Sequence, residues 1–293
     1  MLKVLEWNIR GAASFGWDNE YKIQSWMVDE IIKTDSYDII VLNEFVITTG
    51  WDYFQHQLKQ NGYIWFMTYT SCANGILIAL KNKTFNIKCR KDIQVKGTKN
   101  VCSIFPDFLA VTLNYYELPL TIVGTRINVA LNYQNPYDDF KQRKYQFNLL
   151  CDYLSKLLGR IIVVGDFNNG NIFDESNKNA RYLNCPRQNY NYQMIWREIE
   201  DNMKLTLSTP DQGGKYGSKF SIVTKDKKTK KEYYTKEDHM ISKGFNISKC
   251  DYLWDFVKTE NGYNVKAQDY KGDIKFVPDH AIFYAEMQLD KLY

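Results

Sequence analysis

The chain has 293 residues, of which 44% are hydrophobic, and its 38 basic and 34 acidic side chains leave a formal net charge of +4. This length and apolar content suffice for one large α/β domain, and the mildly cationic charge permits a polyanionic substrate without requiring one. The six cysteines form no C-x-x-C pair, which argues against a zinc ribbon or a thiol redox motif.

No run rich in Pro, Gly or Ser and no internal repeat marks a domain boundary. We therefore expect a single domain over residues 1–293. The segment MLKVLEWNIR lacks the features of a signal peptide, and no apolar run approaches the ~20 residues that span a bilayer. We expect a monomeric, cytoplasmic protein that inserts no segment into a membrane.

Short apolar runs rich in Val, Ile and Leu predict β-strands along the whole chain. They are KVLEW at residues 3–7, DIIVLN at 38–43, NGILIAL at 74–80, FLAVTL at 108–113, LTIVGT at 120–125, RIIVVG at 160–165 and AIFYAEM at 281–287. Segments with helical periodicity lie at residues 21–33, 51–60 and 140–158. A hairpin is expected between KFSIV at 219–223 and EDHMIS at 237–242, with the lysine-rich residues 225–234 at its tip. The mixture predicts an α/β chain with a mixed sheet rather than a regular βαβ array.

Polar side chains directly follow several of these strands. Asn8 follows the first strand, Glu44 the second, Asn128 comes after LTIVGTR, and Asp166 and Asn168 follow IIVV. Open sheets bind ligands beyond the carboxyl ends of their strands, so we expect these residues to converge on one rim.

Two acid–histidine pairs come just before apolar runs, Asp238 with His239 and Asp279 with His280. In an antiparallel pair, the start of one strand lies beside the end of its neighbour, so a mixed sheet brings these pairs to the same rim. With the strand-end residues they form an oxygen-rich set that contains one or two histidines. Such a set suits Mg²⁺ or Mn²⁺ better than zinc.

Taken singly, none of these residues is strong evidence for a site. A strand-terminal Asp or Asn is more often a turn former, and Gly165 is expected to permit the turn after IIVV. His280 could bond to Asp238 through one ring nitrogen and keep the other for a substrate phosphate. The plainer interpretation is a strand-end histidine that the backbone satisfies. His56 lies in a helical segment without a nearby acid and is expected to be structural or on the surface.

Five short motifs, in this order over nearly the full length, resemble the endonuclease/exonuclease/phosphatase superfamily: EWNIRG, LNE, VGDFN, EDHMIS and PDHA. Its members include pancreatic-type deoxyribonucleases, abasic-site endonucleases, sphingomyelinases, inositol polyphosphate phosphatases and deadenylases. The resemblance implies a four-layer α/β/β/α sandwich of two packed mixed β-sheets flanked by helices. It also implies phosphoester hydrolysis that depends on a divalent cation, Mg²⁺ or Mn²⁺. A long helix over residues 138–154 fits the same pattern, with Arg143 where the family often has Arg.

The resemblance gives individual residues their expected roles. Glu44 becomes the principal metal ligand, and Asn8 and Asp279 become further ligands. Asp166 would orient or deprotonate the attacking water, and Asn168 would position that water or contact the scissile phosphate.

Asp238 would pair with His280, which would contact the phosphate and stabilise the charge that develops on it. Arg126 stands about where the family commonly has His, or Tyr in the abasic-site enzymes. Arginine cannot protonate the leaving oxygen at neutral pH, because it does not release its proton. We expect Arg126 and Asn128 to contact the substrate phosphate instead. Three further residues are expected in supporting positions around the site: Arg10, His239 and Arg143.

Nucleic acid is the substrate we expect. The lysine-rich tip at 225–234 could contact a phosphate backbone, or it could be a solvated loop that protects a sheet edge. Aromatic segments in or near predicted loops, at 50–54, 132–137 and 189–196, could stack on bases, although most aromatic side chains pack cores and cover surfaces. The prediction is a nuclease that acts on DNA or RNA. A phosphatase or phospholipase of the same superfamily, acting on inositol phosphates or sphingomyelin, would use the same metal site with another pocket. A non-catalytic nucleic-acid-binding module would be expected to lack at least one of four residues that are all present: Glu44, Asp166, Asn168 and His280.

Overall fold

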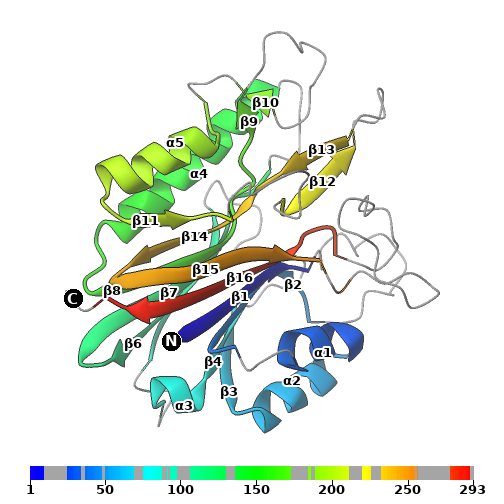
Figure 1. Cartoon of the computed structure of the whole chain (residues 1–293), viewed down its shortest axis with the longest axis vertical. Helices are drawn as coiled ribbons and strands as arrows, with labels where there is room; N and C mark the ends of the chain where they lie inside the picture. The colour runs from blue at the N-terminus through cyan, green and yellow to red at the C-terminus, as the bar shows by residue number, and fades with distance from the viewer. Residues whose placement is uncertain are drawn as a thin grey trace.

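A computed structural model of the protein shows two six-stranded β-sheets that pack face to face between layers of helices (Figure 1). The residues that it describes are 1–9, 25–33, 37–47, 50–68, 75–87, 91, 93–97, 106–129, 136–172, 184–185, 189–210, 220–225, 232–254, 256 and 278–290. The architecture confirms the predicted four-layer α/β/β/α sandwich.

The first sheet has the strand order β15-β16-β1-β2-β4-β3. Its strands are β1 (Leu2–Asn8), β2 (Ile39–Phe45), β3 (Tyr63–Met67), β4 (Gly75–Lys81), β15 (Phe245–Leu253) and β16 (Ile282–Leu289). Only β1 and β2 run parallel, and the other neighbours pair antiparallel. The sheet is therefore mixed, as the sequence predicts, although β3 and β15 were not among the predicted strands.

The second sheet has the strand order β11-β14-β8-β7-β6-β5. Its strands are β5 (Gln94–Gly97), β6 (Asp107–Tyr115), β7 (Leu118–Arg126), β8 (Arg160–Asp166), β11 (Thr206–Ser208) and β14 (Asp238–Lys243). Here β7 and β8 run parallel, and the remaining neighbours run antiparallel. Two short strand pairs lie outside the sheets: β9 (Asn171–Ile172) with β10 (Asn184–Cys185), and β12 (Ile222–Lys225) with β13 (Glu232–Thr235).

The predicted hairpin between KFSIV and EDHMIS is wrong in its second strand. β12 pairs with β13, while the EDHMIS segment forms β14 and pairs with β8 of the second sheet. The aromatic EYYT segment thus supplies the hairpin partner and frees EDHMIS for the central sheet. The tip at 226–231, the aromatic residues 132–135 and Arg10 lie outside the described residues.

Helices cover the outer faces of both sheets: α1 (Ser25–Lys33) and α2 (Trp51–Gln60) on the first, and α4 (Pro136–Leu154) and α5 (Tyr192–Trp196) on the second (Figure 1). A short α3 (Asn82–Phe85) follows β4, and α5 continues into the π-helix η4 (Arg197–Asn202). α4 ends four residues before the end that periodicity alone predicts, in agreement with the 138–154 expectation. The segment 189–196, predicted to lie in or near a loop, is in part helical, because the Asn191 side chain accepts a hydrogen bond from the Met194 N–H (3.0 Å) and caps α5. None of the described helices is long and apolar enough to cross a membrane.

The main hydrophobic core lies between the two sheets and continues on the outer face of the first sheet beneath α1 and α2, and a second core lies between the second sheet and α4, α5 and η4. The two sheets approach each other closely at Gly124 on β7. A Cβ atom there would lie 2.7 Å from a methyl group of Val41 and 2.7 Å from one of Ile76, both on the first sheet. This contact fixes the spacing of the two sheets close to the strand ends that carry the polar residues.

Candidate active site

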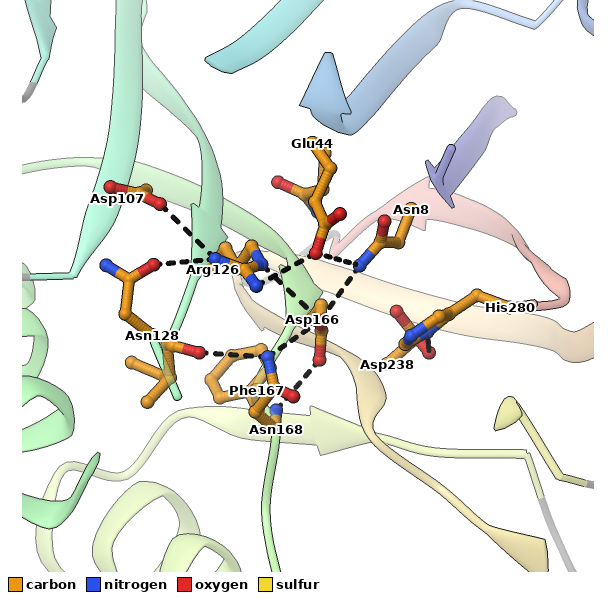
Figure 2. A network of polar contacts seen from close by, with 12 residues as sticks. Asn8, Glu44, Asp107, Arg126, Asn128, Asp166, Phe167, Asn168, Asp238 and His280 are labelled. Atoms are coloured by element: carbon orange, nitrogen blue, oxygen red, sulfur yellow. Dashed lines mark hydrogen bonds and ion pairs between the residues drawn. The ribbon is translucent and has the colours of Figure 1, made fainter. Parts of the chain in front are cut away.

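Strand register places the polar ends of both sheets at one edge. β7 runs parallel to β8 with Arg126 beside Asp166, and β14 runs antiparallel to β8 with Asp238 beside the same aspartate. In the first sheet β1 and β2 end together, with Asn8 beside Asn43. Figure 2 shows side chains from both sheets pointing toward one another at this edge. The site is therefore shared between the sheets.

Asp166 ends β8 and is 1% exposed. Its Oδ1 accepts a hydrogen bond from the backbone N–H of Asn168 (2.8 Å), and its Oδ2 accepts one from the Asn168 side chain (2.8 Å). The Asn8 side chain donates a third to Oδ2 (3.0 Å). Asn168 has a positive φ of 44° and also donates to the carbonyl oxygen of Ile127 (2.9 Å). The Asp-Phe-Asn segment is thus a tight turn that at the same time fixes a carboxylate in place.

Burial raises the pKa of Asp166 to about 6. The positive charges of His280 and Arg126 oppose this rise, and the negative charge of Asp238 adds to it. A carboxylate with this pKa is mostly ionised at pH 7 and is a stronger base than an ordinary aspartate.

His280 lies just before β16 and is 5% exposed. Its Nδ1 lies 2.9 Å from Oδ2 of Asp238, and its backbone carbonyl accepts a hydrogen bond from the indole N–H of Trp7 (3.0 Å). Burial lowers the pKa of His280, but the charge of Asp238 and the hydrogen bond to it outweigh burial and raise the pKa well above its usual value. The imidazole is therefore cationic near neutral pH, with Nε2 not engaged by this contact.

Glu44 lies near the end of β2, where the pairing with β4 shifts register between Leu42 and Phe45. The backbone of Glu44 adopts a positive φ of 53° at this irregularity. Its side chain forms an ion pair with Nη2 of Arg126 at 2.8 Å and accepts a longer hydrogen bond from Asn8 (3.4 Å). The register shift in β2 thus lies where the Glu44 carboxylate contacts Arg126, at the end of β7 in the opposite sheet.

The guanidinium of Arg126 reaches several further partners (Figure 2). Nη1 donates to Oδ1 of Asn128 (2.6 Å) and lies 3.7 Å from Asp107, while Nε lies 3.9 Å from Asp166. Burial lowers the pKa of Arg126, but the surrounding carboxylates outweigh burial and raise it, Glu44 most strongly. Arg126 therefore remains charged and neutralises part of a strongly acidic cluster.

His239 follows Asp238 in β14, and successive strand residues point to opposite faces of a sheet. Since Asp238 contacts His280, His239 faces away from His280. Its Nδ1 lies 2.9 Å from the hydroxyl of Thr209 and its Nε2 lies 2.7 Å from Oδ1 of Asn169. Burial lowers the pKa of His239 to about 3, so the ring is neutral. Asn169 Oδ1 can only accept, so Nε2–H donates to it and Nδ1 accepts from Thr209. His239 supports the turn after β8 from behind.

Arg143 on α4 also supports this turn. It forms an ion pair with Asp139 one helical turn earlier and donates a hydrogen bond to the backbone carbonyl of Asn168. Its guanidinium lies over the ring of Phe140, 4.9 Å from the ring centroid. The long helix thus connects to the Asp-Phe-Asn turn through a buried charged group.

Asp279 lies beside His280 in the chain, is partly buried and contributes to the raised pKa of that histidine. Among the described residues, one group of His, Cys, Asp or Glu has ligand atoms that all lie within 4.8 Å of one another: Asp166, Asp238 and His280. Asp279 and Glu44 do not belong to that group. In this structure, the carboxylate of Glu44 is engaged by Arg126.

A model of the Endonuclease/Exonuclease/phosphatase family matches residues 5–212 of the chain. The chain belongs to this family. The matched region contains Asn8, Glu44, Arg126 and Asp166, and the structure adds His280 from beyond that region to the same edge. The family resemblance of the sequence motifs is confirmed. A search of curated proteins found no match.

Several solved structures of the endonuclease/exonuclease/phosphatase fold resemble this one. The 3′ phosphatase NExo from Neisseria, bound to a product DNA hairpin, has a TM-score of 0.58 at 13% identity, with 98% of this chain and 100% of that chain covered. D. rerio TDP2 in complex with a single-strand DNA product has a TM-score of 0.55 at 12% identity, with 98% of both chains covered. The human Nocturnin catalytic domain with a bound sulfate anion has a TM-score of 0.54 at 13% identity, with 99% and 93% covered. At this identity the likeness shows the fold alone.

Two buried glutamates near the site were not predicted. Glu6 on β1 accepts a hydrogen bond from Asn43 (2.7 Å), and burial, followed by the charge of Asp238, raises its pKa well above the usual value. Burial and the charge of Asp166 raise the pKa of Glu237 to about 8. Glu6 could have been found, because it is an acidic residue inside an apolar strand, two positions before Asn8 and hence on the same face.

The residues at this edge fit a hard divalent cation. The donor set consists mainly of carboxylate and amide oxygens, which Mg²⁺ and Mn²⁺ prefer. Among the described residues, Oδ1 of Asp238 and Oε2 of Glu6 are buried without a hydrogen-bond partner. A cluster with more carboxylates than cations and with unpaired buried oxygens is stabilised by additional positive charge.

Proposed function

We propose that the protein is a divalent-metal-dependent phosphodiesterase that hydrolyses nucleic acid, DNA or RNA, by in-line attack of water. The observation that carries this proposal is the close group of Asp166, Asp238 and His280 at the shared edge of the sheets. An in-line attack needs an oxygen base on one side of phosphorus and positive charge at the phosphoryl oxygens. A fixed carboxylate beside a cationic imidazole offers both.

Asp166 would orient the attacking water and take its proton. Its hydrogen bonds to Asn8 and Asn168 hold the carboxylate in one orientation, and its pKa of about 6 suits a base that works near neutral pH. Asn168 would position the water or contact the scissile phosphate. Arg143 and His239 would keep the turn in place through Asn168 and Asn169.

His280 would donate from Nε2 to a phosphoryl oxygen and stabilise the charge that develops there. The contact between its Nδ1 and Asp238 fixes the ring orientation and keeps it protonated. Arg126 does not release its proton, so the leaving oxygen would take its proton from solvent.

Glu44 would be the principal metal ligand, with Asn8 and Asp279 as further ligands for Mg²⁺ or Mn²⁺. The bound cation supplies Lewis-acid stabilisation of negative charge on the phosphate. Arg126 and Asn128, joined by a hydrogen bond, would contact the phosphate beside it.

Nucleic acid is proposed as the substrate because the NExo and TDP2 structures that share this fold are DNA complexes. The buried free thiol of Cys151 is compatible with a reducing compartment, and we propose that the protein acts as a monomer in the cytoplasm. A phosphatase or phospholipase activity, or nucleic-acid binding without hydrolysis, would replace this proposal if the following panel favours it.

The first prediction concerns activity. The protein is incubated with Mg²⁺ or Mn²⁺ and single-stranded, duplex and abasic-site DNA, RNA, inositol phosphates and sphingomyelin. We expect cleavage of a nucleic acid that a chelator abolishes. Asp166→Ala and His280→Ala should each lower kcat by about two or more orders of magnitude while the circular dichroism spectrum is retained.

Asp201→Ala removes an exposed aspartate of η4 and serves as the matched control, with unchanged activity. Wild-type hydrolysis by Asp166→Ala would refute the assigned chemistry. Release of phosphate from inositol phosphates, or cleavage of sphingomyelin, without any nuclease activity would refute the substrate. Tight binding of nucleic acid with no turnover on any substrate would favour the binding module.

A further inference from the structure

The guanidinium of Arg126 lies between carboxylates from both sheets (Figure 2). Nη2 is 2.8 Å from Glu44 of the first sheet, and Nε is 3.9 Å from Asp166 of the second. Asn8 donates hydrogen bonds to these same two carboxylates. A positively charged side chain thus stands where negative charge is most concentrated, against the carboxylate to which the proposed function assigns the metal.

We propose that Arg126 is a built-in counter-cation that holds Glu44 in the metal-free protein, and that a divalent cation displaces its guanidinium from Glu44 on binding. This inference rests on the metal-dependent function proposed above. Its consequence is that metal binding competes with an internal ion pair and is weaker than the carboxylates alone would allow.

The contacts of Arg126 divide into two sides, which makes such a displacement possible. Nη2 forms the ion pair with Glu44, whereas Nη1 donates to Asn128 (2.6 Å) and lies 3.7 Å from Asp107. The guanidinium can therefore release Glu44 and keep its other anchors. Among the described residues, Nε has no hydrogen-bond partner, so the side toward Asp166 is held by charge alone.

Solvent access identifies Glu44 as the partner that would be exchanged. The side chain of Glu44 is 13% exposed, compared with 6% for Asp107 and 1% for Asp166. A cation that arrives from solvent therefore meets Glu44 before the other two carboxylates. After the exchange, Arg126 would remain tethered by Asn128 beside the metal, where it could neutralise a substrate phosphate.

Manganese binding to the full-length protein tests this inference, with free Mn²⁺ measured by electron paramagnetic resonance at pH 7. We expect Arg126→Gln to bind Mn²⁺ at least about tenfold more tightly than the wild type, the factor that corresponds to roughly 1.4 kcal/mol of removed competition. Arg197→Gln, which removes an exposed arginine of η4, is the charge-matched control and should leave the affinity unchanged. An unchanged or weaker affinity of Arg126→Gln overturns the inference.

A double variant separates displacement from a general effect of charge. If Arg126 competes through Glu44, the gain from Arg126→Gln disappears in a Glu44→Gln background. A gain of the same size in that background overturns the inference. Should Arg126→Gln not fold, Arg126→Lys keeps the charge but replaces the planar fork by one ammonium, and a smaller gain in affinity is expected. Unchanged affinity of a folded Arg126→Lys then overturns the inference.

The outcomes for this inference and for the proposed function are distinguishable. Metal-dependent hydrolysis by the wild type together with unchanged Mn²⁺ affinity in Arg126→Gln refutes only the displacement. Hydrolysis by a wild type that binds no Mn²⁺ refutes both, because no metal then exchanges with Arg126.

Discussion

His239 is neutral in the folded protein because burial lowers the pKa of its imidazole to about 3. In the unfolded chain the pKa of a histidine is about 6.5. Between these values the unfolded state binds a proton that the folded state does not, so this residue makes the protein less stable as the pH falls through that window. At pH 5.5 the loss amounts to about 1.4 kcal/mol relative to pH 7.5.

Urea unfolding at both pH values measures this effect. The free energy of unfolding of the wild type should fall by about 1.4 kcal/mol more between pH 7.5 and 5.5 than that of His239→Gln. Other titrating groups, such as Glu237, contribute equally to both proteins and cancel in the comparison. His56→Gln, at an exposed position of α2, should retain the wild-type pH dependence. An equal fall in wild type and His239→Gln would contradict a neutral buried imidazole.

The position of Asp166 and Asn168 at the end of a buried strand could be predicted from the sequence, because an apolar run that ends in such residues has a recognisable local pattern. The sequence pattern assigned no role to Asn169, yet this residue is 2% exposed and its side chain bonds to His239, seventy positions away. The role of Arg126 was only partly predictable. Its charge could be read from the sequence, but its contact with Glu44 crosses between two sheets, and no local spacing encodes that contact.

The pairing of β7 with β8 places the site carboxylate and depends on Gly165. A Cβ atom at this position would lie 1.8 Å from the backbone oxygen of Thr125 on β7. The sequence suggested that Gly165 permits the turn, but it lies inside β8, where it allows this close approach. Gly165→Ala must separate the two strands and move Asp166.

We therefore expect Gly165→Ala to lower the free energy of unfolding by about 1–3 kcal/mol, as overpacking does, and kcat by roughly tenfold to a hundredfold. Both are measured on the purified variant, by urea titration and by turnover of the best nucleic acid substrate. Gly62→Ala is the control. An alanine at the φ of +73° lowers the free energy of unfolding by about 1 kcal/mol, but nothing lies within 4 Å of the new methyl group. It should retain full kcat. A Gly165→Ala protein with wild-type kcat would show that strand spacing does not position Asp166.

Among the elements, the buried strands and the long helix α4 could be predicted, because continuous apolar runs and helical periodicity are local properties. β13 and β14 were harder to assign. EYYT and EDHMIS both follow KFSIV in the sequence, and either could pair with it. EDHMIS pairs instead with the edge of β8 that β7 does not occupy, and this choice depends on the assembled sheet. The start of α5 was missed because a single cap, Asn191, initiates a short helix in a segment rich in Asn and Tyr.

At the scale of the whole molecule, the candidate site exists only when the two sheets are docked. Asn8 and Glu44 belong to the first sheet, Arg126 and Asp166 to the second, and His280 precedes a strand of the first. The main core contains buried side chains from both sheets, and the same two sheets carry the site residues. Assembly of the core and assembly of the site are therefore the same structural event.

This coupling predicts that the chain unfolds as one unit. In urea, hydrolysis, tryptophan fluorescence and far-ultraviolet circular dichroism should be lost at a common midpoint. Trp7 connects the core to the site, because its ring is buried against Trp26 of α1 on the outer face of the first sheet and its indole N–H donates to the backbone carbonyl of His280. Mg²⁺ at about a hundred times its Kd should raise the free energy of unfolding by about 2.7 kcal/mol and move all three curves together. A chelator should remove this gain, and Asp166→Ala should show less of it. Loss of hydrolysis well before fluorescence, or two separate transitions, would mean that the sheets unfold independently and that residues 1–293 are not one domain.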